Sequence, residues 1–210
     1  VAAENRLTKQ EVMDLVEPID SIPVNEGDVV TMGVDQGKGI HVVVKKQMPD
    51  GKLAIVYLGI HQNFEDLDGL MTKYRVRRCV IDALPETRKA REFANRHKGK
   101  VFLNFYNINQ KVKPKWDEEK LMVEENRTES LDFSHNLLKM KMTIIPRGLE
   151  HIDEYADQCS KVAKKLEEDE ETGSKRYIYV KLGPDHFRHA DNYATLYWME
   201  KETMPRIRSL

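Results

Sequence analysis

Apolar and polar residues follow two different periods along this chain, and each change of period marks a predicted element. Apolar, β-branched runs at 29–35, 40–46 and 53–60 are separated by the turn signals Gln36-Gly-Lys-Gly39 and Met48-Pro-Asp-Gly51. Runs of this length with short Gly- and Pro-containing breaks are typical of strands and turns. We therefore expect residues 29–60 to form an antiparallel meander of three strands.

Beyond residue 60 the pattern alternates between helical and extended segments. Helices are expected at 64–74 and 86–97, and strands at 78–82 and 101–106. Because parallel strands need long crossover connections, this alternation predicts that the sheet continues with parallel strands. The following segment, 107–126, is polar and irregular.

The last third of the chain predicts more helices and an inserted hairpin. The whole order indicates an α/β fold with a mixed central sheet, antiparallel in its first three strands and then parallel, flanked by helices. The expected elements are a helix at 127–140, a short extended piece at 143–146, a helix at 149–166, a β-hairpin at about 167–181 and a helix at 185–199.

The N-terminal residues differ in pattern from the rest. Residues 7–16 predict a short helix, with Thr8 as N-cap and Glu11 three residues later. Residues 17–28 contain two prolines, a glycine and several acids, which favours a linker or an extended arm. We expect residues 1–28 to be a junction and residues 29–210 to form the main domain.

Composition narrows the class of protein. Charged residues make up 33% of the chain and apolar residues 40%, which is typical of a soluble globular domain. No apolar run reaches the roughly 18 residues that span a bilayer, and the start shows no signal-peptide pattern. Cys79 and Cys159 lie far apart without CxxC spacing, which predicts reduced intracellular thiols.

The net charge of −1 hides an uneven distribution. Residues 73–120 contain fourteen Lys and Arg against six acids, a balance of +8. Such a segment can form a local patch that faces DNA, although Arg88 to Arg96 could equally coat the outside of a helix. The residues we expect to contact phosphates are Arg75, Arg77, Arg78, Lys111, Lys113 and Lys115.

Three aspartates are the candidates for chemistry. Asp35 and Asp82 each close an apolar run, where Asp is also common as a turn former. Asp191 is harder to explain, because helical spacing puts it on one face with Phe187 and Trp198. A carboxylate on a packing face needs a partner, either a metal ion or an arginine such as Arg188. Several carboxylates together can hold hard divalent cations.

The neighbours of Asp191 are weaker candidates. Asp185 follows Gly-Pro and precedes a helix, so N-capping is its expected role, with metal binding as the less favoured alternative. His186 and His189 form an HxxH pattern without cysteines, which is a weak zinc signal. We expect surface positions, or contact with a metal ligand, for His186 and His189, and contact with a metal ligand for Arg188.

These motifs, in their order and spacing, resemble the ribonuclease H-like nuclease domain of the large terminase subunit of tailed bacteriophages. The resemblance covers about residues 29–200 and rests on Met-Gly-Val-Asp35, Val-Ile-Asp82, Asn126-Arg-Thr-Glu-Ser-Leu131, the inserted hairpin and Asp185-His-Phe-Arg-His-Ala-Asp191. Some relatives have a histidine where this chain has Arg188.

The resemblance implies an endonuclease that cuts concatemeric viral DNA with two Mg²⁺ or Mn²⁺ ions. Asp35 would bridge the ions, Asp82 would complete one site and Asp191 the other. Implied partners are double-stranded DNA, an N-terminal ATPase domain absent from this chain, the portal and the small terminase subunit, with no membrane. The implied location is the cytoplasm of the bacterial host.

Two other classes of function stay open. A junction resolvase or an integrase would share the carboxylates and cut other substrates. A non-catalytic DNA-binding or docking module would keep the fold without the chemistry. We also expect the hairpin, with its five consecutive acids, to gate access to the site, or else to be a neutral insertion.

Overall fold

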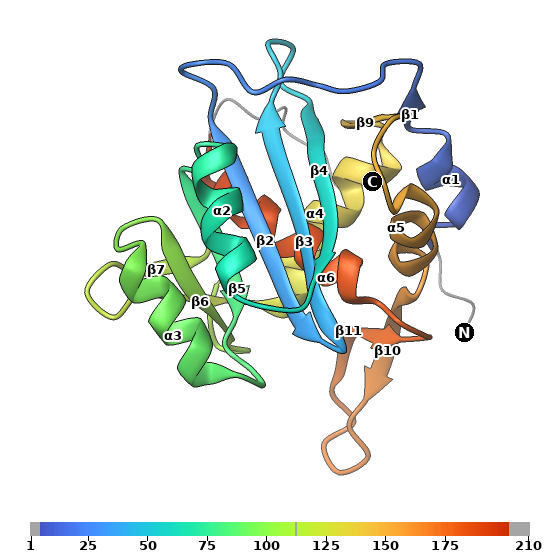
Figure 1. Ribbon diagram of the computed structural model, residues 1–210. Helices are drawn as coiled ribbons and strands as arrows, with labels where there is room; N and C mark the ends of the chain where they lie inside the picture. Colours follow the sequence, from blue (N-terminus) through green and yellow to red (C-terminus); the bar gives the residue numbers. More distant parts are fainter. Residues whose placement is uncertain (1–4, 112, 202–210) are drawn as a thin grey trace.

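A computed structural model shows one nine-stranded mixed sheet and a separate two-stranded hairpin, and it describes residues 5–111 and 113–201 (Figure 1). The strand order of the large sheet is β1-β9-β4-β3-β2-β5-β6-β8-β7. The strands are β1 (Val16–Glu17), β2 (Val30–Gly37), β3 (Gly39–Gln47), β4 (Leu53–His61), β5 (Arg78–Asp82), β6 (Val101–Tyr106), β7 (Lys115–Asp117), β8 (Met122–Glu125), β9 (Thr143–Pro146), β10 (Val162–Glu168) and β11 (Lys175–Lys181).

Helices cover both faces of this sheet. α2 and α3 pack on one face, whereas α4, α5 and α6 pack on the other (Figure 1). In the described part of the chain no helix is long and apolar enough to cross a membrane. The helices are α1 (Lys9–Met13), α2 (Glu65–Lys73), α3 (Thr87–Arg96), α4 (Arg127–Lys139), α5 (Ile152–Cys159) and α6 (His186–Thr195), which continues as the 3₁₀ helix η1 (Leu196–Glu200).

The pairing confirms the predicted mixed architecture. β2, β3 and β4 are antiparallel neighbours, and β5 then joins β2 in parallel, followed by β6 and β8. The predicted strands 78–82 and 101–106 match β5 and β6 residue for residue. The segment 107–126, expected to be irregular, contains the short strands β7 and β8 at the edge of the sheet.

Side chains of β2 point alternately to the two faces of the sheet, so each helical layer packs on its own set of β2 residues. Val30, Met32 and Val34 point to the α2–α3 face and belong to the larger apolar core. Gly33 points to the other face, where a side chain would collide with the backbone of α6 at Ala190. The absence of a side chain at Gly33 therefore lets α6 lie directly on β2.

The N-terminal segment packs against the main sheet and its helices. Thr8 caps α1 with the predicted capping box, and Leu7, Val12 and Leu15 are buried in the core beneath α5. β1 pairs with β9 at the edge of the sheet. The apolar side chains of this segment, rather than its prolines and acids, determine its position.

The inserted hairpin is present but begins earlier than predicted. The helix expected at 149–166 ends at Cys159, and β10 starts at Val162. β10 pairs with β11 from Val162–Lys181 to Glu168–Lys175. These cross-strand hydrogen bonds outweigh the local helical pattern of residues 160–166. The hairpin projects at the end of the molecule where β2 terminates (Figure 1).

Candidate active site

Two aspartates lie side by side where neighbouring parallel strands end. Asp82 is the last residue of β5, and Asp35 lies two residues before the end of β2. The register pairs Val34 with Ile81, so the next residues, Asp35 and Asp82, are level and share a face. Asp35 is only 6% exposed. The structure therefore brings these two predicted site residues together.

His186, the first residue of α6, holds Asp35 in place. Its Nδ1 donates to Oδ2 of Asp35 at 2.7 Å, and its ring stacks on His41 with 4.7 Å between centroids. Burial raises the pKa of Asp35, and the His186 hydrogen bond offsets only part of this effect. The same hydrogen bond raises the pKa of His186. Asp35 is thus fixed in surroundings that disfavour its negative charge.

Asp82 is half-buried and ends a strand whose exit loop is held by Gln36. Burial raises the pKa of Asp82, and the negative charge of Asp35 adds to this effect. Gln36 donates from Nε2 to the backbone oxygen of Asp82 at 2.6 Å and accepts from the backbone N–H of Glu86 at 3.2 Å. The residue next to Asp35 therefore fixes the backbone around Asp82.

Asp185 comes to the same place, at the start of α6. The charge of Asp185 acts on Asp35 and raises its pKa further. Nε2 of His189 donates to Oδ2 of Asp185 at 3.0 Å. Burial alone would raise the pKa of Asp185, but His189 and Lys181 hold it below the usual value.

Asp185 and His189 lie together at the start of α6. Asp185 stands at the N-cap position of α6, but its side chain makes no capping hydrogen bond among the described residues, so its expected capping role is wrong. His189 contacts a carboxylate of the site, and its charge also acts on Asp35 and Asp82.

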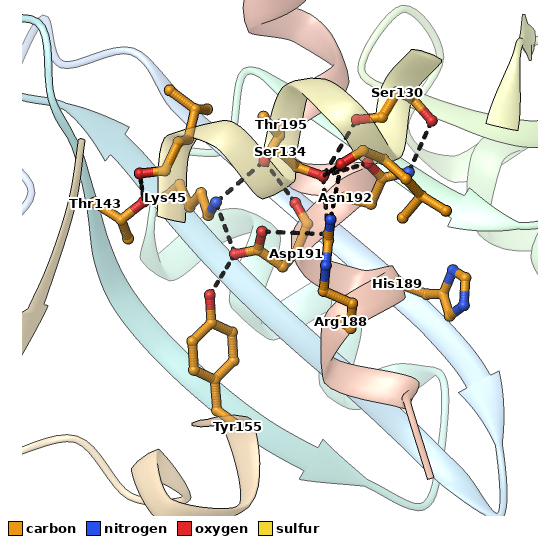
Figure 2. A network of polar contacts seen from close by, with 12 residues as sticks. Lys45, Ser130, Ser134, Thr143, Tyr155, Arg188, His189, Asp191, Asn192 and Thr195 are labelled. Carbon is orange, nitrogen blue, oxygen red and sulfur yellow. Dashed lines mark hydrogen bonds and ion pairs between the residues drawn. The ribbon is translucent and has the colours of Figure 1, made fainter. Parts of the chain in front are cut away.

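Asp191 lies elsewhere, in the middle of the layer between α6 and the sheet. It is 0% exposed, and its Oδ1 is 2.7 Å from Nζ of Lys45 and 2.7 Å from the hydroxyl of Tyr155 (Figure 2). Lys45 is paired with Thr31, four residues before Asp35 in β2, a separation of about 13 Å along the strand. The structure does not bring Asp191 together with Asp35 and Asp82.

The expected partner of Asp191, Arg188, is only its second neighbour. Their nearest atoms are 4.0 Å apart, and Arg188 donates instead to the Ser134 hydroxyl at 2.8 Å and to the Leu131 backbone oxygen at 3.0 Å. Figure 2 shows His189 pointing away from this network. Arg188 and Asp191 thus belong to one buried polar network.

The predicted phosphate contacts divide between the two ends of the strands. Arg77 bonds through its backbone to Val30 at the start of β2, and Arg78 begins β5. The Arg78 guanidinium lies 4.5 Å from the ring centroids of both Phe102 and Trp116, so it packs against aromatic rings. The three arginines, Arg75, Arg77 and Arg78, therefore precede β5 or begin it, at the end opposite Asp82.

The lysines of the second group are better placed. Lys111 and Lys113 are exposed in the segment that leaves the carboxyl end of β6. Lys115 begins β7 and pairs with Glu124 near the end of β8. All three lie near the carboxyl ends of β5 and β6, which is also where Asp82 lies.

The side chains at this end of the strands are of the chemical type that binds hard divalent cations. Among the described residues, no three acidic, histidine or cysteine side chains converge closely enough to hold a metal ion as they stand. However, Asp35 and Asp82 are oxygen donors of the type that Mg²⁺ and Mn²⁺ prefer. Burial and mutual repulsion disfavour both negative charges, and a cation between them would relieve both effects.

Sequence reasoning missed several residues of this region. Gln36 and Lys45 act through contacts with residues 46 and 146 positions away, and no local pattern reports such pairs. A partial signal existed for Lys45, since a lysine inside an apolar strand must find an anion when it is buried.

Comparisons with known proteins give matches in structure only. No protein-family model matches the sequence, and no curated protein matches it. The large terminase nuclease of thermophilic phage G20c with bound magnesium matches with a TM-score of 0.54 and 13% identity, covering 90% of this chain and 96% of that one. The human cytomegalovirus terminase nuclease domain matches with a TM-score of 0.53 and 11% identity, covering 93% and 96%.

A longer protein matches as well. The large terminase of a second thermophilic bacteriophage gives a TM-score of 0.51 and 16% identity, covering 88% of this chain and 44% of that one. At such low identities the similarity concerns the fold. This chain has the mixed α/β fold, with its separate hairpin, of the nuclease domain of large terminases.

Proposed function

We propose that this chain is a metal-dependent DNA endonuclease that cuts viral DNA during genome packaging. One observation carries the proposal: Asp35 and Asp82 stand side by side at the ends of adjacent parallel strands, next to Asp185. The fold shared with terminase nuclease domains supports the same function. Because the carboxylates are held by elements far apart in sequence, the arrangement is a property of the whole fold.

In this proposal Asp35, Asp82 and Asp185 hold Mg²⁺ or Mn²⁺. Asp185 takes the position that the sequence assigned to Asp191, because Oδ1 of Asp191 is paired with Lys45 and accepts from Tyr155, while its Oδ2 is buried 4.0 Å from Arg188. When bound, such cations make a water molecule more acidic and offset the charge that develops on the phosphate.

Other residues of the chain orient the carboxylates and the DNA. His186 fixes Oδ2 of Asp35, and Oδ1 would face the cation. Gln36 keeps the loop after Asp82 closed against the end of β2. Lys111 and Lys113 contact backbone phosphates, and such contacts carry no sequence information, so cleavage is only weakly sequence-specific.

The proposed partners follow from this function. The substrate is double-stranded DNA. The proposed neighbours are an N-terminal ATPase domain of the same protein, the portal and the small terminase subunit, in the cytoplasm of a bacterial host. This chain spans less than half of the longer phage large terminase that it matches, which was also solved in complex with ADP.

Plasmid cleavage tests the proposal. Supercoiled DNA is incubated with the protein and Mn²⁺, Mg²⁺, Ca²⁺ or EDTA, beside Asp35→Asn, Asp82→Asn and Asp185→Asn, each checked for folding. Asp153→Asn, at a carboxylate whose side chain is 80% exposed, is the matched control. We expect nicking and linearisation with Mn²⁺ that vanish in the three site variants and persist in the control.

The substrate range separates the proposal from its alternatives. Linear duplex, a four-way junction and an RNA–DNA hybrid are compared under the same conditions. Preference for the junction would indicate a resolvase, and a folded wild-type protein that cuts nothing with any metal, alone or joined to an ATPase domain, would indicate a binding module.

A further inference from the structure

The row of polar side chains that begins with Asp35 and Asp82 continues across two more strands. Asn104 in β6 is paired directly with Asp82. β8 runs parallel to β6, with Val123 opposite Asn104 and Glu125 opposite Tyr106. Because side chains alternate along a strand, Asn104 and Glu125 point to the same face as Asp82. Glu125 is thus a fourth acidic residue at this end of the sheet.

Glu125 and Asn104 are buried without hydrogen-bond partners of normal geometry. Glu125 is 1% exposed and Asn104 is 3% exposed. In the described part of the chain, neither carboxylate oxygen of Glu125 nor either amide atom of Asn104 has such a partner. Buried polar atoms are almost always satisfied, and exceptions point to an ion, a water molecule or a functional role.

The electrostatic surroundings of Glu125 disfavour its negative charge. Burial raises its pKa to about 8, while Ser130, Asn104 and the charge of Arg127 offset part of that effect and the negative charge of Asp82 adds to it. The influence of Asp82 shows that the two carboxylates lie within each other's field. A bound cation would stabilise both.

Arg127, the cationic residue nearest to Glu125 in the sequence, makes its contacts with other residues. The Arg127 guanidinium donates to the backbone oxygen of Tyr179 at 2.9 Å and lies 5.6 Å from the ring centroid of Tyr106. Of the ion pairs formed by the described residues, none includes Glu125, although its neighbour in β8, Glu124, has the side-chain amide of Asn107 as a donor. Among the described residues Glu125 therefore has neither an ion-pair partner nor a hydrogen bond of normal geometry.

We propose that Glu125 is a further ligand carboxylate of the cation centre at Asp82, with the side-chain oxygen of Asn104 as another donor between them. Oxygen donors of these two kinds, carboxylate and amide, are typical of Mg²⁺, Mn²⁺ and Ca²⁺ sites. This inference depends on the proposed nuclease function and adds a fourth acidic group to it.

Binding of Mn²⁺ alone, without DNA, tests the inference. Affinity is measured by isothermal titration calorimetry for the wild type, Glu125→Gln, Asp35→Asn and Glu124→Gln. The last variant is a matched control, since Glu124 is the same residue type one position earlier and points to the opposite face. We expect Glu125→Gln to weaken Mn²⁺ binding by about tenfold or more, and Glu124→Gln to leave it unchanged.

Two outcomes and one further variant separate the role of Glu125 from the nuclease proposal. If Glu125→Gln binds Mn²⁺ like the wild type while Asp35→Asn does not bind, the role of Glu125 is wrong and the nuclease proposal stands. If the wild type does not bind Mn²⁺ at all, both fail. Glu125→Asp, which keeps the charge but shortens the reach, is a second variant in case Glu125→Gln does not fold, and we expect it to bind with lowered affinity.

Discussion

Replacing Asp191 tests whether this carboxylate holds the fold together or holds a metal ion. Asp191→Asn would leave the Lys45 ammonium, whose side chain is 0% exposed, without an anion. Removing one partner of a buried ion pair costs about 3–5 kcal/mol. Typical domains are stable by only about 5–15 kcal/mol, so this single change removes a large share of the total.

A metal ligand behaves in the opposite way when the metal is removed. Burial raises the pKa of Asp35, so the folded chain disfavours its ionised form. We therefore expect Asp35→Asn to be as stable as the wild type in EDTA, or more stable. The double variant Lys45→Met with Asp191→Leu removes both buried charges and should recover most of the stability that Asp191→Asn loses.

The assay is thermal and urea unfolding in EDTA, followed by circular dichroism. For a domain of about this size, a loss of about 3–5 kcal/mol lowers the melting temperature by roughly 6–20 °C. Asp191→Asn should show this loss, whereas Asp35→Asn should not. The reasoning would be refuted if Asp191→Asn unfolded like the wild type while losing Mn²⁺ binding as completely as Asp35→Asn.

Three more predictions concern charged groups of the structure. In EDTA the folded chain keeps the proton of Glu125, because burial raises the pKa of this residue from 4.5 to about 8. The free energy of unfolding therefore falls as the pH rises from about 4.5 to about 8, and Glu125→Gln should flatten the dependence of the urea midpoint on pH. Lys111→Ala with Lys113→Ala should weaken DNA binding and lower its salt dependence, whereas Arg75→Ala with Arg77→Ala should change neither, as a filter-binding salt titration would show. Replacing the acidic tip of the β10–β11 hairpin by a tight turn should change the plasmid cleavage rate or the substrate preference, and an unchanged rate would remove the gating role.

The strands that carry Asp35 and Asp82 could be predicted because their signals are local. An apolar run, a terminal aspartate and a turn all fall within a few residues, and the order of elements then places both carboxylates at one edge of the sheet. The same kind of local evidence correctly showed that Asp191 on the apolar face of α6 needs a partner. It could not identify that partner, because Lys45 reaches Asp191 only through the packing of α6 on β3.

The N-terminal segment and the hairpin show a different limit. The sequence predicts a short helix at 7–16, but the burial of Leu7, Val12 and Leu15 depends on α5, which comes much later in the chain. The helical pattern up to Leu166 likewise yields to pairing with β11. In both cases a distant segment, invisible to a local pattern, determines the local structure.

Anomalous diffraction from crystals grown with Mn²⁺ tests the central claim most directly, because it locates the metal without any assay of cleavage. We predict density for Mn²⁺ between Asp35 and Asp82, in contact with Asp185, while Lys45 stays paired with Asp191. Density beside Asp191 with Lys45 displaced, or no bound Mn²⁺ near Asp35 at millimolar concentrations, would contradict the account.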